Sequence, residues 1–286
     1  MVGGLVPLTT IRTFTSLEKT QKFKVMAKRG RPSKRINTVE KNLKVNTVQM
    51  NALEFNEKLF IPMRTNTKID EFFSGDKGLM PGVNYVCTGD PGSGKTTLLL
   101  DVLANLQKQG KKCLFVSGEM NAIDMVGYVR RYPKFGDLEI LFMGDYADNN
   151  PDLVLRKAFS KGYDVILIDS MAEIADLYTE YFGGTNKSNQ TKLLQLLQEH
   201  NLGGNDEKIN TSFLVIQQVT KGGVFVGSNK LKHMTTGMLH LKITGEGRFL
   251  YFSKNRRGGN MNKLYYSLDT NHHVQYLHEE IMDMER

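Results

Sequence analysis

The residues from Gly89 to Thr96 have the types and spacing that bind the phosphates of a nucleotide. They read GDPGSGKT and fit the pattern G-x-x-x-x-G-K-[ST]. In this pattern the glycines let backbone N–H groups curl round a phosphate, the lysine reaches the β and γ phosphates, and the last hydroxyl binds Mg²⁺. The segment therefore predicts a nucleoside triphosphate site. Its predicted residues are Gly89, Asp90, Pro91, Gly92, Ser93, Gly94, Lys95, Thr96 and Thr97.

Two carboxylates at the ends of other apolar runs would complete such a site. Asp169 ends the run DVILID, where a parallel sheet places it beside the phosphate loop to hold Mg²⁺ together with Thr96. Glu119 follows the run KCLFVSG, where it can orient the attacking water as a general base, with Lys95 stabilising the phosphates. We expect the strand that leads to Glu119 to lie next to the strand of the phosphate loop.

These residues need a scaffold in which apolar strands alternate with helices. Continuous apolar runs of strand length, separated by segments of helical period, predict a parallel sheet that helices cover on both faces. The predicted strands are 83–89, 112–119, 138–145, 163–170 and 211–218, and the predicted helices are 95–109, 121–131, 151–161 and 188–200. After residue 236 the helical pattern stops, and the runs 237–244, 248–255 and 263–269 predict antiparallel strands that extend the sheet.

The positive charge of the chain is concentrated in its first 48 residues. These hold eleven Lys or Arg against Glu18 and Glu40, whereas residues 49–286 hold 27 basic and 28 acidic side chains. We therefore predict a basic flexible tail, 1–48, and one α/β domain, 49–286. The tail is either a solubilising arm, an organelle-targeting segment or a contact to DNA. In the third case Arg29 and Arg31 of its RGRP run would lie in a minor groove, like the core of an AT-hook.

Composition narrows the classes of protein further. Hydrophobic residues make up 40% of the 286 residues, which is ordinary for a globular protein, and no apolar stretch is long enough to span a membrane. The first residues do not have the pattern of an export signal, so we expect a protein that works inside a cell. Cys87 and Cys113 have no Cys or His nearby at metal-ligand spacing, so we expect both in the core.

Several motifs occur together in the order seen in one family. The segment NTKIDEFFSGDKGLMPGVNYVCTGDPGSGKTTLLLDV is followed by VSGE, VILIDS, QVTKGGVFVGSNKLKHM and KNRRGG. This series resembles the RecA-like ATPase core of the RadA (Sms) family over residues 62–270. The resemblance implies a RecA-like P-loop fold, ATP and Mg²⁺ as ligands, and a DNA-dependent ATPase that drives branch migration in homologous recombination.

The same resemblance assigns roles to three further residues. Gln218, at the end of the fifth strand, would sense the γ-phosphate and pass its position to the loop that follows. Lys254 and Arg256 of KNRRGG would enter the nucleotide site of a neighbouring subunit and neutralise developing charge, as an arginine finger does. Such an arrangement requires a homo-oligomer, either a hexameric ring or a filament.

Two segments are expected to face single-stranded or branched DNA. The loop after Gln218 resembles a family DNA-binding loop, and its residues Lys221, Gly222, Gly223, Lys230 and Lys232 combine mobility with charges for a phosphate backbone. The segment 171–192, with Lys187 and Lys192, corresponds to the other DNA-facing loop of RecA-like proteins.

The chain departs from the RadA pattern in three ways. It lacks the N-terminal four-cysteine zinc module and the C-terminal protease-like domain, and Arg257 replaces a Phe. We expect a minimal version of the family, such as a phage might encode, in the cytoplasm of a bacterial or phage-infected cell. Two alternatives stay open at this point: a replicative hexameric helicase of the DnaB type, and a RecA-like regulatory ATPase that binds protein partners and no DNA.

Overall fold

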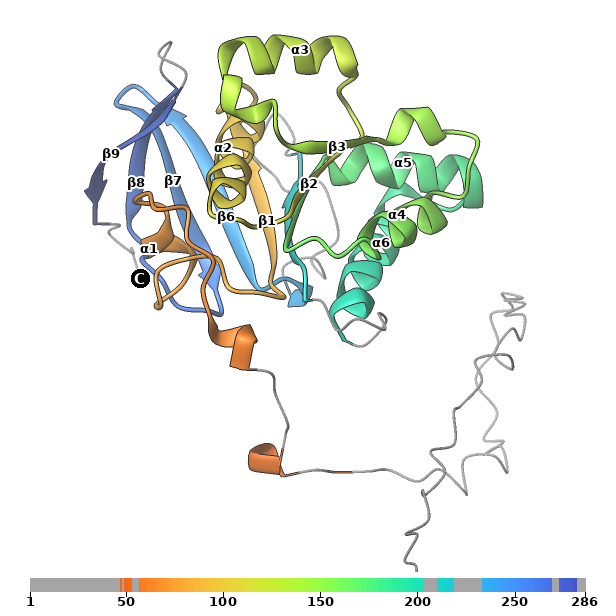
Figure 1. Cartoon of the computed structure of the whole chain (residues 1–286), viewed down its shortest axis with the longest axis horizontal. Coiled ribbons are helices and arrows are strands. Elements are labelled where there is room, and N and C mark those ends of the chain that lie inside the picture. Colours follow the sequence, from red (N-terminus) through yellow and green to blue (C-terminus); the bar gives the residue numbers. More distant parts are fainter. Residues whose placement is uncertain are drawn as a thin grey trace, which may run out of the picture. The chain divides into compact units, whose positions relative to one another are not determined.

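The fold is built on a sheet whose strands run in the order β3-β2-β4-β5-β1-β6-β7-β8-β9 (Figure 1). The structure is a computed structural model that describes residues 47, 49–52, 57–202, 210–218, 233–268 and 273–281. The chain divides into two units, residues 1–53 and 54–286. The described part of the first unit includes one short 3₁₀ helix, η2 (Met50–Ala52), and the strands found in the described residues all belong to the second unit.

The strands near the phosphate loop are parallel. They are β1 (Asn84–Gly89), β2 (Cys113–Ser117), β3 (Glu139–Phe142), β4 (Val165–Asp169), β5 (Ser212–Ile216) and β6 (Gly237–Thr244). The remaining strands are antiparallel to their neighbours: β7 (Gly247–Asn255), β8 (Lys263–Leu268) and β9 (Val274–Glu280). The mostly parallel α/β class is thereby confirmed.

Two expectations about the sheet are wrong. β6 pairs with β1 in parallel, so the antiparallel part begins only at β7. The strand that leads to Glu119, β2, pairs with β3 and β4, and the neighbours of β1 are β5 and β6. Both outcomes depend on pairing between strands far apart in the chain, which strand length and hydrophobicity do not encode.

Helices cover the two faces of the parallel strands. They are α1 (Asp70–Phe73), α2 (Lys95–Lys108), α3 (Ala122–Arg131), α4 (Pro151–Phe159), α5 (Met171–Phe182) and α6 (Asn186–Asn201), with 3₁₀ turns η3 (Glu57–Phe60), η4 (Pro133–Phe135) and η5 (Met143–Tyr146). Along β1 the side chains alternate between two cores. Tyr85 and Cys87 pack with α1 and α2, and Val86 packs with α4, α5 and α6. Burial on both faces explains why β2, β4 and β5 consist mostly of apolar residues. Cys87 and Cys113 are both buried, as expected.

The segment 171–182, expected to be part of a DNA-facing loop, is instead the helix α5. Met171, Ile174, Ala175 and Tyr178 recur at helical spacing and are buried, so they form the apolar face of an amphipathic helix. Lys187 and Lys192 lie on the next helix, α6, whose first turn is closed by a capping box at Thr185.

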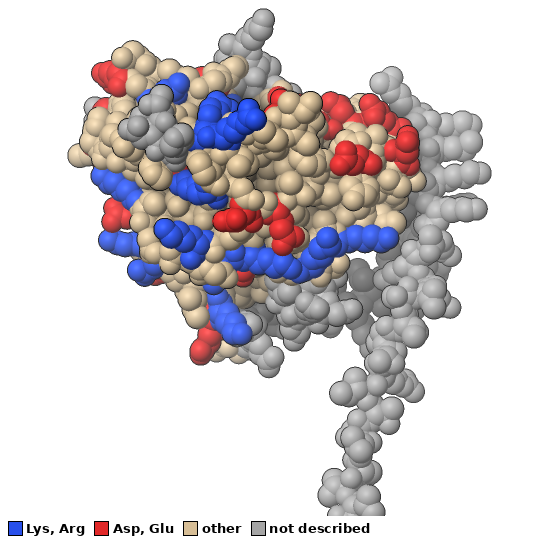
Figure 2. Space-filling view, turned by 45° about the horizontal axis from the view of Figure 1, so that its top comes forward, with Lys and Arg blue, Asp and Glu red and all other residues tan. Residues whose placement is uncertain are grey.

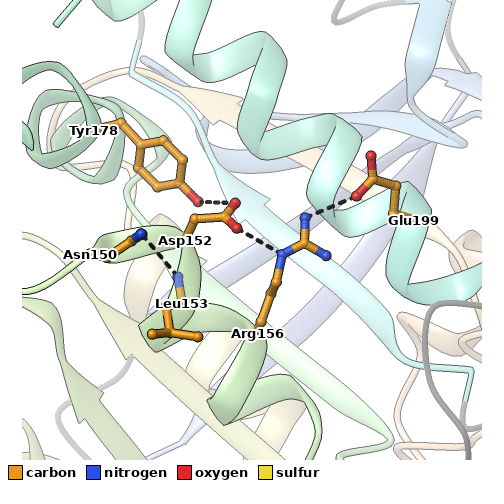
Figure 3. A network of polar contacts seen from close by, with 6 residues as sticks. All are labelled: Asn150, Asp152, Leu153, Arg156, Tyr178 and Glu199. Carbon is orange, nitrogen blue, oxygen red and sulfur yellow. Dashed lines mark hydrogen bonds and ion pairs between the residues drawn. The ribbon is translucent and has the colours of Figure 1, made fainter. Parts of the chain in front are cut away.

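A polar network joins α4, α5 and α6 on the outside of this core (Figure 3). Arg156 on α4 donates from Nε to Asp152 Oδ2 (2.7 Å) and from a terminal nitrogen to Glu199 Oε2 on α6 (2.9 Å). The Tyr178 hydroxyl on α5 donates to Asp152 Oδ1 (3.2 Å). These bonds fix the position of α5, which starts directly after β4 and so borders the candidate site.

Candidate nucleotide site

The phosphate loop is a tight turn between β1 and α2. Gly94, the residue before α2, has φ 89°, and a Cβ placed there would lie 2.2 Å from Leu268 Cδ1. At Gly89 a Cβ would lie 2.4 Å from the Leu241 carbonyl oxygen. Only glycine fits either position, because the first needs left-handed backbone and both face close neighbours. The turn therefore presents backbone N–H groups at the start of a helix, which is a favourable place for an anion.

The C-terminal strands fasten this loop from the side. The Tyr266 hydroxyl on β8 donates to the Ser93 carbonyl oxygen (2.7 Å), and Lys242 on β6 pairs with Asp90 (3.3 Å). The Lys95 ammonium donates to the carbonyl oxygens of Gly89 (3.0 Å) and Asp90 (3.1 Å). Contacts within the protein thus hold the loop and its lysine in a defined shape.

A cavity of about 380 Å³ lies over the loop. Its lining brings together residues from the carboxyl ends of β1, β4 and β5 and from the segment after β2: Gly89, Pro91, Gly92, Lys95, Thr96, Glu119, Asp169, Ile216 and Gln218. In an open parallel sheet this edge is where ligands bind, because the strands end there side by side. Of these residues, only Ile216 lies outside the set predicted from the sequence.

Thr96 and Asp169 form the part of the cavity suited to a divalent cation. Thr96 Oγ1 donates to Asp169 Oδ2 (2.5 Å), and Asp169 is buried. Burial raises the pKa of Asp169 to about 6, while the hydrogen bond from Thr96 acts in the opposite direction. A hydroxyl and a carboxylate oxygen side by side are ligands that Mg²⁺ prefers, so the residues present fit this ion.

Tyr128 of α3 packs against the core that includes α2. Burial raises the pKa of Tyr128, and the negative charge of Asp169 adds to the rise. Thr97 is buried in the first turn of α2. Asp90, Ser93 and Gly94 form the turn beneath the cavity, with Asp90 and Ser93 joined by a backbone hydrogen bond of 3.1 Å.

Glu119 reaches the cavity although β4 and β5 separate its strand from β1. The backbone turns there because Gly118 N donates to the Asp169 carbonyl oxygen (2.7 Å), which places Glu119 next to the end of β4. Its side chain is exposed at the mouth of the cavity. Partial burial raises the pKa of Glu119, and the negative charge of Glu173 adds to the rise. A carboxylate with a raised pKa is better suited to accept a proton.

Glu173 is a residue of this site that the sequence interpretation missed. Gln218 Nε2 donates to Glu173 Oε1 (2.7 Å), and the Ser170 hydroxyl donates to Glu173 Oε2. The one sequence signal, the Ser-x-x-Glu spacing from 170 to 173, is typical of a helix cap and indicates no role in a site.

Lys254 and Arg256 contribute nothing to the lining of this cavity. Lys254 Nζ donates to the Thr235 carbonyl oxygen (2.7 Å), and Arg256 donates to the His233 carbonyl oxygen (3.0 Å). Burial lowers the pKa of Lys254, and the nearby Arg256 lowers it further. Asn255 between them anchors the turn, since its side chain donates to the carbonyl oxygens of Phe72 and Phe73 (both 3.0 Å).

The DNA contacts predicted in the loop after Gln218 and in the tail lie outside the described residues. These are Lys221, Gly222, Gly223, Lys230, Lys232, Arg29 and Arg31. Over the face shown in Figure 2, basic side chains form a row, and acidic side chains lie directly beside it. This mixture agrees with the near balance of charge in residues 49–286. In the described part of the chain, no helix has the length and apolar character required to cross a membrane.

Comparison with known proteins places these features in a family. The sequence pattern of the RecA N-terminal domain matches residues 36–257. A DNA repair protein RadA of Streptococcus pneumoniae is 31% identical over 207 residues, covering 68% of this chain and 44% of its own. The protein of the same name from Campylobacter jejuni is 29% identical over 184 residues, covering 64% and 39%. The chain thus spans about two fifths of the length of the curated relatives it matches.

Solved structures show the same fold. A KaiC-like protein, PH0186, from Pyrococcus horikoshii aligns over 76% of this chain and 99% of its own with a TM-score of 0.57. At 18% identity this similarity concerns the arrangement of strands and helices alone.

Proposed function

The chain belongs to the RecA N-terminal domain family, and from this premise we propose that it is a Mg²⁺-dependent ATPase stimulated by DNA, acting in recombination and repair. The observation that carries the proposal is the gathering of Lys95, Thr96, Asp169, Glu119 and Gln218 around one cavity at the carboxyl edge of the sheet. A phosphate loop, a cation site and a carboxylate at the mouth are the parts that hydrolysis of a phosphoanhydride requires.

The residues divide the work of hydrolysis. Lys95 would exchange its two loop carbonyls for the β and γ phosphates, and Thr96 and Asp169 would hold Mg²⁺, which would neutralise phosphate charge. Glu119 accepts a proton from the attacking water as its oxygen bonds to the γ-phosphorus. The bond from that phosphorus to the β–γ bridging oxygen then breaks, and ADP leaves with the electron pair.

Lys254 and Arg256 complete the site of a neighbouring copy. Both cations lie at the end of β7 and bond to backbone carbonyls away from their own cavity. We propose that a second cation, in addition to Lys95, reaches the γ-phosphate from another subunit, which makes a homo-oligomeric ring or filament part of the proposal. An isolated subunit would hydrolyse ATP slowly.

DNA is the proposed partner on two grounds. The relatives carry the name DNA repair protein, and the predicted loop 219–232 and tail 1–48 contain 14 of the 38 lysines and arginines, which could meet a phosphate backbone. We propose that single-stranded or branched DNA binds there and that branch migration or strand exchange is driven by hydrolysis. The working compartment would be the cytoplasm of a bacterial or phage-infected cell.

The test is ATP turnover with and without single-stranded DNA. The wild type should hydrolyse ATP faster with DNA. Lys221→Ala should lose this increase and keep nucleotide binding, while Lys157→Ala, a change of an exposed lysine on α4, should behave as the wild type. Turnover that no DNA increases would contradict a DNA-stimulated ATPase and favour a regulatory ATPase with protein partners.

A second measurement addresses the tail. If residues 1–48 supply phosphate contacts, deleting them should reduce the slope of log affinity for DNA against log salt concentration. An unchanged slope would assign the tail to solubility or targeting.

A further inference from the structure

Glu173 lies close to three residues predicted for the site, Asp169, Glu119 and Gln218. It lies in the first turn of α5, directly after β4. Its two carboxylate oxygens accept from different partners, Oε1 from Gln218 Nε2 at 2.7 Å and Oε2 from the Ser170 hydroxyl. The side chain thereby joins the end of β5 to the end of β4.

The bonds of Glu173 differ from those expected of a helix cap. In a capping box the Ser170 hydroxyl would accept from the backbone N–H of Glu173, and the carboxylate would accept from the backbone N–H of Ser170. The structure forms no side-chain cap at this helix. The carboxylate instead accepts from the side chain of Gln218, a residue that lines the nucleotide cavity, so local helix stability does not explain its placement.

Glu173 also lies against the residues that carry the chemistry. A Cβ at Gly118, the residue before Glu119, would lie 3.2 Å from Glu173 Cβ, which shows how closely the two segments pack. The negative charge of Glu173 contributes to the raised pKa values of both Glu119 and Asp169. Glu173 is therefore a third carboxylate close to Glu119 and Asp169.

The bond to Gln218 determines how that amide faces the cavity. A carboxylate can only accept hydrogen bonds, so it selects the NH₂ end of the glutamine and not its carbonyl oxygen. One N–H is used by Glu173, and the other is available to a phosphate oxygen. Gln218 is exposed, and without this contact its side chain would rotate among several rotamers.

We propose that Glu173 is a positioning residue for ATP hydrolysis, which holds the Gln218 amide with its NH₂ group toward the γ-phosphate. The inference rests on the proposed function, because it assumes that Gln218 acts on that phosphate. The anchor is rigid, since α5 is tied to α4 through Tyr178 and Asp152 (Figure 3). Glu173 touches neither ATP nor the attacking water in this role.

The experiment compares kcat and ATP affinity in five variants. Glu173→Ala should lower kcat by roughly 10-fold, because a misplaced donor loses transition-state contact, and should leave the Kd for ATP unchanged. Glu173→Gln should retain most of the activity, since its amide oxygen accepts the same hydrogen bond. Gln218→Ala should resemble Glu173→Ala, and the double variant should be no slower than Gln218→Ala alone. Glu180→Ala, an exposed acid on the same helix, is the control and should match the wild type.

Three results would overturn the positioning role. They are a kcat of Glu173→Ala equal to that of the wild type, a double variant whose losses multiply, and a Glu173→Gln variant as slow as Glu173→Ala. Thermal melting of each variant separates a loss of folded protein from a loss of turnover. A wild type that fails to hydrolyse ATP would refute the proposed function itself, and the role of Glu173 with it.

Discussion

The two halves of the sheet are stabilised differently and do different work. In the parallel half, β1 to β5 lie between two helical layers, and the cavity is lined by residues at the ends of β1, β4 and β5 and by Glu119 after β2. In the antiparallel half, β7, β8 and β9 contribute to the core shared with α1 and α2, but no described side chain of these strands joins the core beneath α4 to α6. The first half therefore holds the reacting groups, and the second half supports them from one side.

The antiparallel half replaces the second helical layer with contacts between its own strands. Aromatic rings form a row across β6, β7, β8 and β9, from His240 through Tyr251, Phe249 and Tyr265 to His278, with ring centroids 4.4 to 6.1 Å apart. Cross-strand pairs of this kind each add a few tenths of a kcal/mol up to about 1 kcal/mol to a sheet. Strands that contribute no described residue to the cavity can thus still hold the phosphate loop, as Tyr266 on β8 does through its hydrogen bond to Ser93.

The largest expected effect comes from the parallel half. Lys95→Ala should reduce ATP turnover by about 10³-fold or more and abolish measurable nucleotide binding, because it removes the cation that faces the phosphates. Lys108→Ala, at the exposed far end of α2, is the matched control and should change neither quantity. Tight ATP binding by the Lys95→Ala variant would contradict the proposal that the phosphate loop binds ATP through Lys95.

The next effect tests whether the antiparallel half serves a second copy. Arg256→Ala should lower turnover by about 10³-fold, as loss of an arginine finger does, without weakening ATP binding. Mixing it with Lys95→Ala subunits should restore part of the activity, because the latter still supply Arg256 to their neighbours. A mixture no more active than its parts would contradict a site shared between subunits.

Glu119→Gln separates ATP binding from ATP hydrolysis in the parallel half. The variant should bind ATP as the wild type does, and turnover should fall by about 10² to 10³-fold, since an amide cannot accept the proton of water. Single-turnover measurement of phosphate release checks this. Hydrolysis at the wild-type rate would refute the assignment of Glu119 as the base.

The smallest expected effect concerns the hydrogen bond by which β8 holds the phosphate loop. Tyr266→Phe removes the hydrogen bond to the Ser93 carbonyl oxygen, and the free energy of unfolding should drop by about 1 kcal/mol. Urea denaturation is the readout, and Tyr181→Phe at the exposed end of α5 is the control. Equal stability of the two variants would mean that the loop keeps its shape without the brace.

Several parts of the site follow from local sequence. GDPGSGKT predicts a turn and a helix start at the observed positions, and the apolar run before Asp169 predicts a buried strand that ends there. The order of the strands could not be predicted, because pairing joins segments such as 84–87 and 213–216. The helix 171–182 was missed although its apolar residues have helical spacing, because the family resemblance favoured a loop there.

The sequence by itself determined the phosphate loop, the alternation of strands and helices, and the carboxylates at the ends of the strands, since each depends on residues close together in the chain. Only the tertiary structure decided that Glu119 reaches the cavity from beyond β4, that Tyr266 holds the loop, and that Glu173 binds Gln218. These contacts join residues 45 or more positions apart, and which distant groups meet depends on how the whole sheet pairs and packs.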